Sequence, residues 1–111
     1  MVEHFPNAIA CPGGFWEITV DDMKQLPEGV RQIDVREASE LVGDMGLLPG
    51  VDHVPLGLVP REFRAWNPEE PLVIICRSGG RSARAALWLQ QQGFTQVVSV
   101  RGGMLDWNGY C

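Results

Sequence analysis

The sequence predicts an α/β domain with a small central parallel sheet and helices on both faces. Short apolar runs rich in Val and Ile alternate along the chain with segments of helical periodicity, and one run, residues 71–76 (PLVIIC), is apolar without alternation. Such a run is typical of a central parallel strand covered on both faces. Strands that alternate with helices favour right-handed parallel crossovers. The 111 residues are enough for a single domain over residues 1–111.

Five runs are expected to form the strands. In chain order they are residues 15–19, 30–35, 51–56, 71–76 and 96–100. Each contains β-branched, aromatic or continuous apolar residues, and turn-forming residues lie between them. The predicted sheet therefore has about five strands.

Helices are expected between and after these strands. They cover residues 20–26, 36–43, 60–66, 81–93 and 102–107. Asp21 and Asp22 favour the first turn of the first helix because acidic side chains interact well with a helix N-terminus. Pro60 is typical of a helix start, and Gly93 of a helix end.

The composition is that of an ordinary soluble globular protein, with 45% hydrophobic and 21% charged residues. The apolar runs are far shorter than the roughly 18 residues that a membrane helix needs. The first residues lack the basic and apolar regions of a secretory signal. We therefore expect a cytoplasmic protein that does not bind membranes.

The net charge of −5 is unevenly distributed. Residues 1–70 carry 13 acidic residues against five Lys or Arg, whereas residues 71–105 contain four arginines and no acidic residue. A locally positive region on an acidic protein suggests a site for a small anion. Nucleic acid is not an expected partner, because the sequence has no extended basic stripe interleaved with aromatic residues.

The three cysteines, Cys11, Cys76 and Cys111, are odd in number and widely scattered. This pattern fits neither a disulfide framework nor a zinc site. Cys11 and Cys111 are expected to be incidental thiols. Cys76 is different, because it stands at the carboxyl end of the best-defined strand, where open α/β sheets bind their ligands.

The residues after Cys76 are suited to binding an anion. Gly79 and Gly80 allow backbone conformations in which successive N–H groups point inward, and Ser78 and Ser82 add hydroxyl donors. Ser82 is also a candidate cap for the helix that follows.

Arg77 and Arg81 flank these glycines and add positive charge near the thiol. Amides, a helix N-terminus and guanidinium groups all favour a thiolate, which is the reactive form of cysteine. The alternative is that Cys76 is a small core residue, but a core role explains none of the arginines.

Four segments, in order, resemble those of the single-domain rhodaneses, a family of sulfurtransferases. CRSGGRS (76–82) resembles the active-site loop of the family, and QIDVRE (32–37) resembles its Asp-Val-Arg element. GLLPGVDHVPL (46–56) is similar to the family's Gly-His-Ile-Pro-Gly-Ala segment, and VVSVRGGMLDW (97–107) to its closing Gly-Gly and Trp element. The resemblance covers nearly the whole chain and implies a rhodanese-like fold.

The resemblance also implies a mechanism. The Cys76 thiolate would attack the outer sulfur of thiosulfate or of a persulfide donor and keep that sulfur as a persulfide. A thiol, cyanide or a sulfur-carrier protein would then accept it. The resemblance implies no metal and no organic cofactor. By this resemblance the donor would be bound by the loop residues Arg77, Ser78, Gly79, Gly80, Arg81 and Ser82.

Asp34 and Arg36 invite a catalytic interpretation because they lie at a strand end. The favoured alternative is a supporting role, in which they hydrogen-bond loop backbone and pair with neighbours around the site. His53 is expected to pack in an apolar setting instead of acting as a general base.

Two other function classes remain open. Cysteine-based phosphatases and arsenate reductases also place a cysteine in an anion-binding loop closed by arginine, but their pattern leaves five residues between the two, and four lie between Cys76 and Arg81. A non-catalytic rhodanese-like binding or sulfur-relay module is the other class. Such modules commonly lack the cysteine that this chain has.

Overall fold

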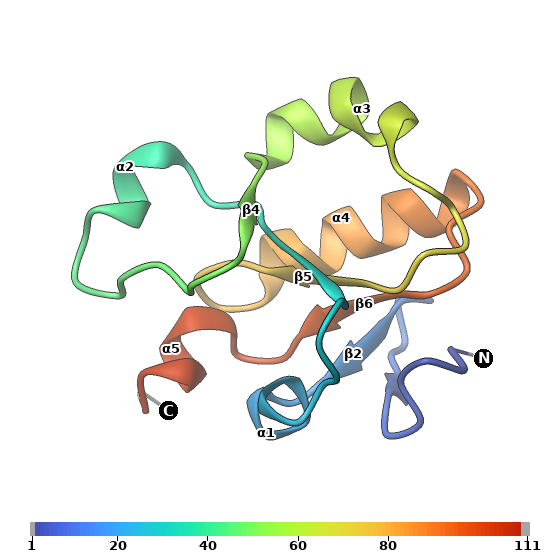
Figure 1. The fold of residues 1–111 in the computed structure, drawn as a ribbon, viewed down its shortest axis with the longest axis horizontal. Helices are drawn as coiled ribbons and strands as arrows, with labels where there is room; N and C mark the ends of the chain where they lie inside the picture. The colour runs from blue at the N-terminus through green and yellow to red at the C-terminus, as the bar shows by residue number, and fades with distance from the viewer. Residues whose placement is uncertain (1, 110–111) are drawn as a thin grey trace.

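A six-stranded sheet with helices on both faces forms the centre of the computed structural model, which describes residues 2–109 (Figure 1). The order of the strands across the sheet is β1-β2-β6-β5-β3-β4. The strands are β1 (Ile9–Ala10), β2 (Trp16–Ile18), β3 (Arg31–Asp34), β4 (Asp52–His53), β5 (Leu72–Ile75) and β6 (Val97–Val100).

The five expected strands are present and pair in parallel, with shorter bounds than predicted. The prediction of a purely parallel sheet misses the edge strand β1, which pairs antiparallel with β2. Its two residues, Ile9 and Ala10, are exposed and too few to show the alternation of a strand, so a sequence pattern could not reveal it. The predicted strand over residues 51–56 is also shorter, because β4 ends at His53 and a 3-10 turn begins at Leu56 with Pro55 as its N-cap.

The helices are α1 (Val20–Lys24), α2 (Ala38–Leu41), α3 (Val59–Glu62), α4 (Gly80–Gln91) and α5 (Gly103–Trp107). The expected helix over residues 60–66 is a short α3 between two 3-10 turns, Leu56–Leu58 and Phe63–Ala65. Within residues 2–109, none of the helices has both the length and the apolar character needed to span a membrane.

The central strand β5 is buried on both faces, as its uninterrupted apolar run predicts. Val73 and Ile75 pack in one core cluster with residues of α1 and α5. Leu72, Ile74 and Cys76 pack in the other, with residues of α3 and α4. Figure 1 shows α3 and α4 on one side of the strands and α1 and α5 on the other.

The strand order places a topological switch point between β3 and β5. The chain leaves β3 through α2 toward β4, and it leaves β5 through α4 toward β6 on the opposite side. Crossovers that diverge in this way leave a crevice beyond the carboxyl ends of the two strands, which is where α/β sheets bind ligands. Asp34 and Ile75, the last residues of β3 and β5, are register partners, so the segments that follow both strands meet at this edge.

Candidate active site

The Cys76 side chain lies directly beyond β5, at the switch point. Its Sγ accepts hydrogen bonds from the backbone N–H of Gly79 at 3.1 Å and of Ser82 at 3.4 Å. The residue is 1% exposed and belongs to the core cluster beneath α4. The thiol therefore lies at the base of the loop, with its sulfur enclosed by backbone donors.

Gly79 gives the loop its sharp turn. Its φ of 104° lies in the left-handed region, and an added Cβ would be 3.3 Å from the backbone nitrogen of Gly102. Gly79 is the N-cap of α4, which begins at Gly80. The expectation that Ser82 caps this helix is therefore wrong. Ser82 lies within the first turn because the glycine already provides the non-helical conformation that a cap requires.

A buried pair of hydroxyl groups lies beneath the sulfur. The Ser82 Oγ is 3.4 Å from the Cys76 Sγ and 2.7 Å from the Oγ of Ser99 on β6, and it also donates to the carbonyl oxygen of Gly79 at 3.1 Å. Both serines are at most 1% exposed. Their mutual contacts satisfy polar groups that would otherwise be costly to bury, and they fix Ser82 relative to the sheet.

The start of α5 holds the carbonyl groups of the loop. The N–H of Met104 donates to the Cys76 carbonyl at 2.8 Å, and the N–H of Leu105 donates to the Arg77 carbonyl at 2.9 Å. Gly103, with φ of 53°, packs so closely that an added Cβ would be 2.3 Å from the Cys76 carbonyl oxygen. The carbonyl groups of Cys76 and Arg77 are therefore hydrogen-bonded to α5 and directed away from the rest of the loop.

Asp34 and Arg36 form a buried ion pair beside the loop. The guanidinium donates from Nε and Nη2 to the Asp34 carboxylate, at distances of 2.8 to 3.1 Å, and Nη2 also donates to the Gly46 carbonyl at 2.7 Å. The two residues are 0% and 1% exposed. The Nε2 of His53 is 2.6 Å from the Arg36 carbonyl oxygen, and since a carbonyl can only accept, the ring nitrogen donates. These contacts hold the segment after β3 in place.

Arg81 forms a bidentate ion pair with Glu40 of α2. Its Nη1 and Nη2 donate to the two carboxylate oxygens at 2.5 and 2.8 Å. Glu40 also accepts from the backbone N–H of Glu37 as part of a capping box at the start of α2. The hydrogen bonds from Arg81 lower the pKa of the Glu40 carboxyl to about 2 from its ordinary 4.5.

Half of the positive charge of residues 71–105 is therefore paired in the folded chain. Arg101 pairs with Glu17 at 2.6 Å, as Arg81 does with Glu40. Among residues 2–109, Arg77 and Arg84 form no ion pair, and both are exposed. Arg77 is thus the loop arginine whose charge is free, while Ser78 and Gly80 are exposed at the loop surface.

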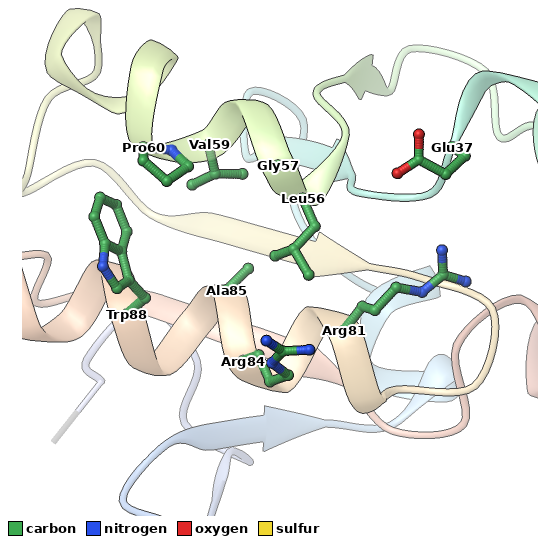
Figure 2. Close-up of a pocket in the computed structure, with 9 residues that line it drawn as sticks. All are labelled: Glu37, Leu56, Gly57, Val59, Pro60, Arg81, Arg84, Ala85 and Trp88. Atoms are coloured by element: carbon green, nitrogen blue, oxygen red, sulfur yellow. The ribbon is translucent and has the colours of Figure 1, made fainter.

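A pocket of about 480 Å³ opens beside the loop, between α4 and the segment that contains α3. Figure 2 shows Glu37 and Arg81 at one end and Pro60 and Trp88 at the other. Cys76 does not line it, so this pocket adjoins the loop without containing the thiol.

Cys11 does not join this site. Burial, with Glu17 adding to the effect, raises the pKa of the Cys11 thiol, which makes this residue a poorer nucleophile than an unperturbed cysteine. Cys111 lies outside the described residues. Over residues 2–109, the His, Cys, Asp and Glu side chains form no group of three that could hold a metal ion.

Sequence reasoning missed Glu40 and Ser99. Glu40 follows Glu37 by three residues, which is the spacing of a capping box but gives no sign of a partner in α4. Ser99 interrupts an otherwise apolar strand, and a single polar residue facing the core there is the one available signal.

Comparison with known proteins agrees with the motif resemblance. The family described as the Rhodanese-like domain matches residues 19–110. YrkF of Bacillus subtilis, provisionally named a sulfur carrier protein, is 40% identical over 106 residues, which cover 93% of this chain and 54% of YrkF. The chain therefore spans about half the length of that relative.

Two further relatives are similar in size to this chain. The thiosulfate sulfurtransferase GlpE of Pseudomonas aeruginosa (strain PAO1) is 32% identical over 94 residues, with 84% of each chain covered. The crystal structure of a rhodanese-like domain protein from Staphylococcus aureus superposes with a TM-score of 0.74 at 32% identity, covering 82% of this chain and 89% of that one.

Replacing Gly103 by Ala tests the contact between α5 and the loop. We expect Gly103→Ala to lower the free energy of unfolding by about 3 kcal/mol or more, because left-handed strain and overpacking add. Gly50 is a matched control, with φ of 76° and nothing within 4 Å of an added Cβ. Gly50→Ala should cost only about 1 kcal/mol, measured by urea unfolding. Equal costs for the two variants would contradict the proposed contact.

The Glu40–Arg81 pair should make the free energy of unfolding fall as the pH is lowered. Because the pKa of Glu40 falls from 4.5 to about 2 on folding, its contribution is complete above pH 4.5 and is lost as the pH falls toward 2. The pair is partly exposed, so we expect about 1 kcal/mol. Urea unfolding should show Glu40→Gln less stable than the native chain near neutral pH, with the difference disappearing in acid. A difference that stays constant with pH would exclude this contribution.

Proposed function

Because the chain belongs to the rhodanese-like family, we propose that it is a sulfurtransferase that carries sulfur as a persulfide on Cys76, with thiosulfate as a donor. The observation that carries the proposal is the enclosure of the Cys76 Sγ by the backbone N–H groups of Gly79 and Ser82, at the end of the central strand. Such donors stabilise negative charge on sulfur, and both the attacking thiolate and the persulfide product are anions.

In the first step the Cys76 thiolate attacks the outer sulfur of thiosulfate. A bond forms between the two sulfurs, the sulfur–sulfur bond of the donor breaks, and sulfite leaves with that bond's electron pair. The total charge is unchanged, because one thiolate and one dianion give one persulfide anion and sulfite dianion. The backbone N–H groups of Gly80 and Arg81, in the first turn of α4, have no partner within the helix and are available to the oxygens of the donor.

In the second step a nucleophile takes the outer sulfur from Cys76. Cyanide, for example, forms thiocyanate and restores the thiolate, and a thiol acceptor becomes a persulfide in the same way. The enclosed position of Cys76, at 1% exposure, favours a small reacting end over a bulky one. A protein acceptor would therefore present its reactive sulfur on an extended end.

Intact mass spectrometry after brief exposure to thiosulfate tests the role of Cys76. The native chain should gain the mass of one sulfur atom and lose it on reduction, and Cys76→Ser should gain none. Cys11→Ser is the matched control and should still take up the sulfur, because that thiol lies outside the loop. An adduct that persists in Cys76→Ser would move the chemistry to another cysteine.

Arg77 is the loop arginine without an ion-pair partner among residues 2–109, so we assign it to attracting the donor. Arg77→Ala should raise the KM for thiosulfate about tenfold, the usual cost of losing a charge-assisted contact. Steady-state formation of thiocyanate measures this change. Arg64→Ala, which removes an exposed arginine from the 3-10 turn Phe63–Ala65, is the control and should leave the KM unchanged. An unchanged KM in Arg77→Ala would show that Arg77 does not bind the donor and that the backbone N–H groups of the loop suffice.

A further inference from the structure

We propose that Glu40 sets the charge of the donor that the Cys76 loop accepts, by neutralising Arg81 and thereby disfavouring dianions more than monoanions. This inference rests on the sulfurtransferase function proposed above. It makes Glu40 a specificity-determining residue that acts through Arg81 and does not itself touch the sulfur.

The geometry restrains Arg81 strongly. Both terminal nitrogens of its guanidinium donate to Glu40, at 2.5 and 2.8 Å, in the two-point arrangement that arginine and carboxylate favour. Glu40 is restrained in turn, because its Oε1 accepts from the backbone N–H of Glu37 at 3.0 Å. Arg81 therefore cannot turn toward a donor in the loop without giving up hydrogen bonds to a carboxylate that is itself tied to the start of α2.

The pair also removes charge from the site. Arg81 is at the second position of α4, five residues after Cys76, and its side chain is 32% exposed, while that of Glu40 is 28% exposed. An anion in the loop meets the guanidinium and the carboxylate together, so attraction by one is opposed by the other. The remaining favourable charge comes from Arg77 and from the backbone N–H groups.

The charge of the donor decides how much this opposition matters. The Coulomb energy between a carboxylate and an anion is proportional to the anion's charge, so Glu40 repels a dianion twice as strongly as a monoanion at the same place. Thiosulfate is a dianion. Methanethiosulfonate is a monoanion that offers the same outer sulfur, since its transfer leaves methanesulfinate. The two donors therefore differ mainly in charge at the site.

The test compares these donors in Glu40→Gln. Glutamine keeps an oxygen that can accept from the Glu37 N–H, so the capping box survives while the ion pair is lost. We expect kcat/KM for transfer to cyanide to rise about tenfold with thiosulfate and about threefold with methanethiosulfonate, following the two-to-one ratio of Coulomb energies. Equal changes for both donors, or no change, would overturn the proposal.

Two controls separate the ion pair from general effects of charge. In an Arg81→Gln background, Glu40→Gln should favour thiosulfate over methanethiosulfonate less than it does in the native chain, because only the direct repulsion by the carboxylate is then removed and no guanidinium is released. An equal preference in both backgrounds would show that Arg81 takes no part. Glu37→Gln removes a neighbouring carboxylate that forms no ion pair within residues 2–109, and it should change the donor ratio less than Glu40→Gln does. An equal change in Glu37→Gln would show that the ion pair is not the determinant.

A binding measurement keeps this proposal separate from the proposed function. Sulfate is a dianion without a transferable sulfur, and titrating it while following the amide resonances of Gly79 and Gly80 measures anion binding alone. Glu40→Gln should bind sulfate about tenfold more tightly than the native chain. If the native chain takes sulfur from neither donor, the function fails while this titration still decides the effect of Glu40. Unchanged sulfate affinity in Glu40→Gln would refute the proposed effect of Glu40.

Discussion

The close contact between Gly103 and the carbonyl groups of Cys76 and Arg77 is the constraint on which the site depends. Two N–H groups at the start of α5 bind these carbonyls, and no residue with a Cβ fits at Gly103 without displacing them. With the first two loop carbonyls directed to α5, the N–H groups of the following turn are left to face the sulfur. A segment more than 25 residues from the cysteine thus determines the donors around it.

Two ion pairs lie on the β3 side of the site, and they differ in environment. Asp34 and Arg36 are fully buried and share four hydrogen bonds with each other, so this pair acts as a rigid part of the scaffold. Arg81 and Glu40 are partly exposed and join the starts of α4 and α2. A partly exposed pair contributes less to stability, because solvent screens its charges.

Local patterns predicted the parts of the site that are continuous in sequence. The apolar run of β5, the cysteine at its end and the glycine turn before α4 can all be read within about ten residues, and family resemblance added the order of the segments. The partners Ser99 and Glu40 were missed because each lies far from the loop in sequence and is brought to it by strand order and by the position of α2. The assignment of Ser82 as a cap failed because Gly79 already satisfies that role.

The charge of residues 71–105 shows how folding changes the meaning of a sequence pattern. Its four arginines suggest a strongly positive site, yet Arg81 and Arg101 are paired with acids from the first 70 residues. Fixed backbone dipoles, whose positions are set by the turn and by α5, therefore provide the donors that contact the sulfur. Such donors act at short range and need no counter-ion. In the proposed mechanism they would stabilise charge on the transferred sulfur, while the side chains would determine which anions approach it.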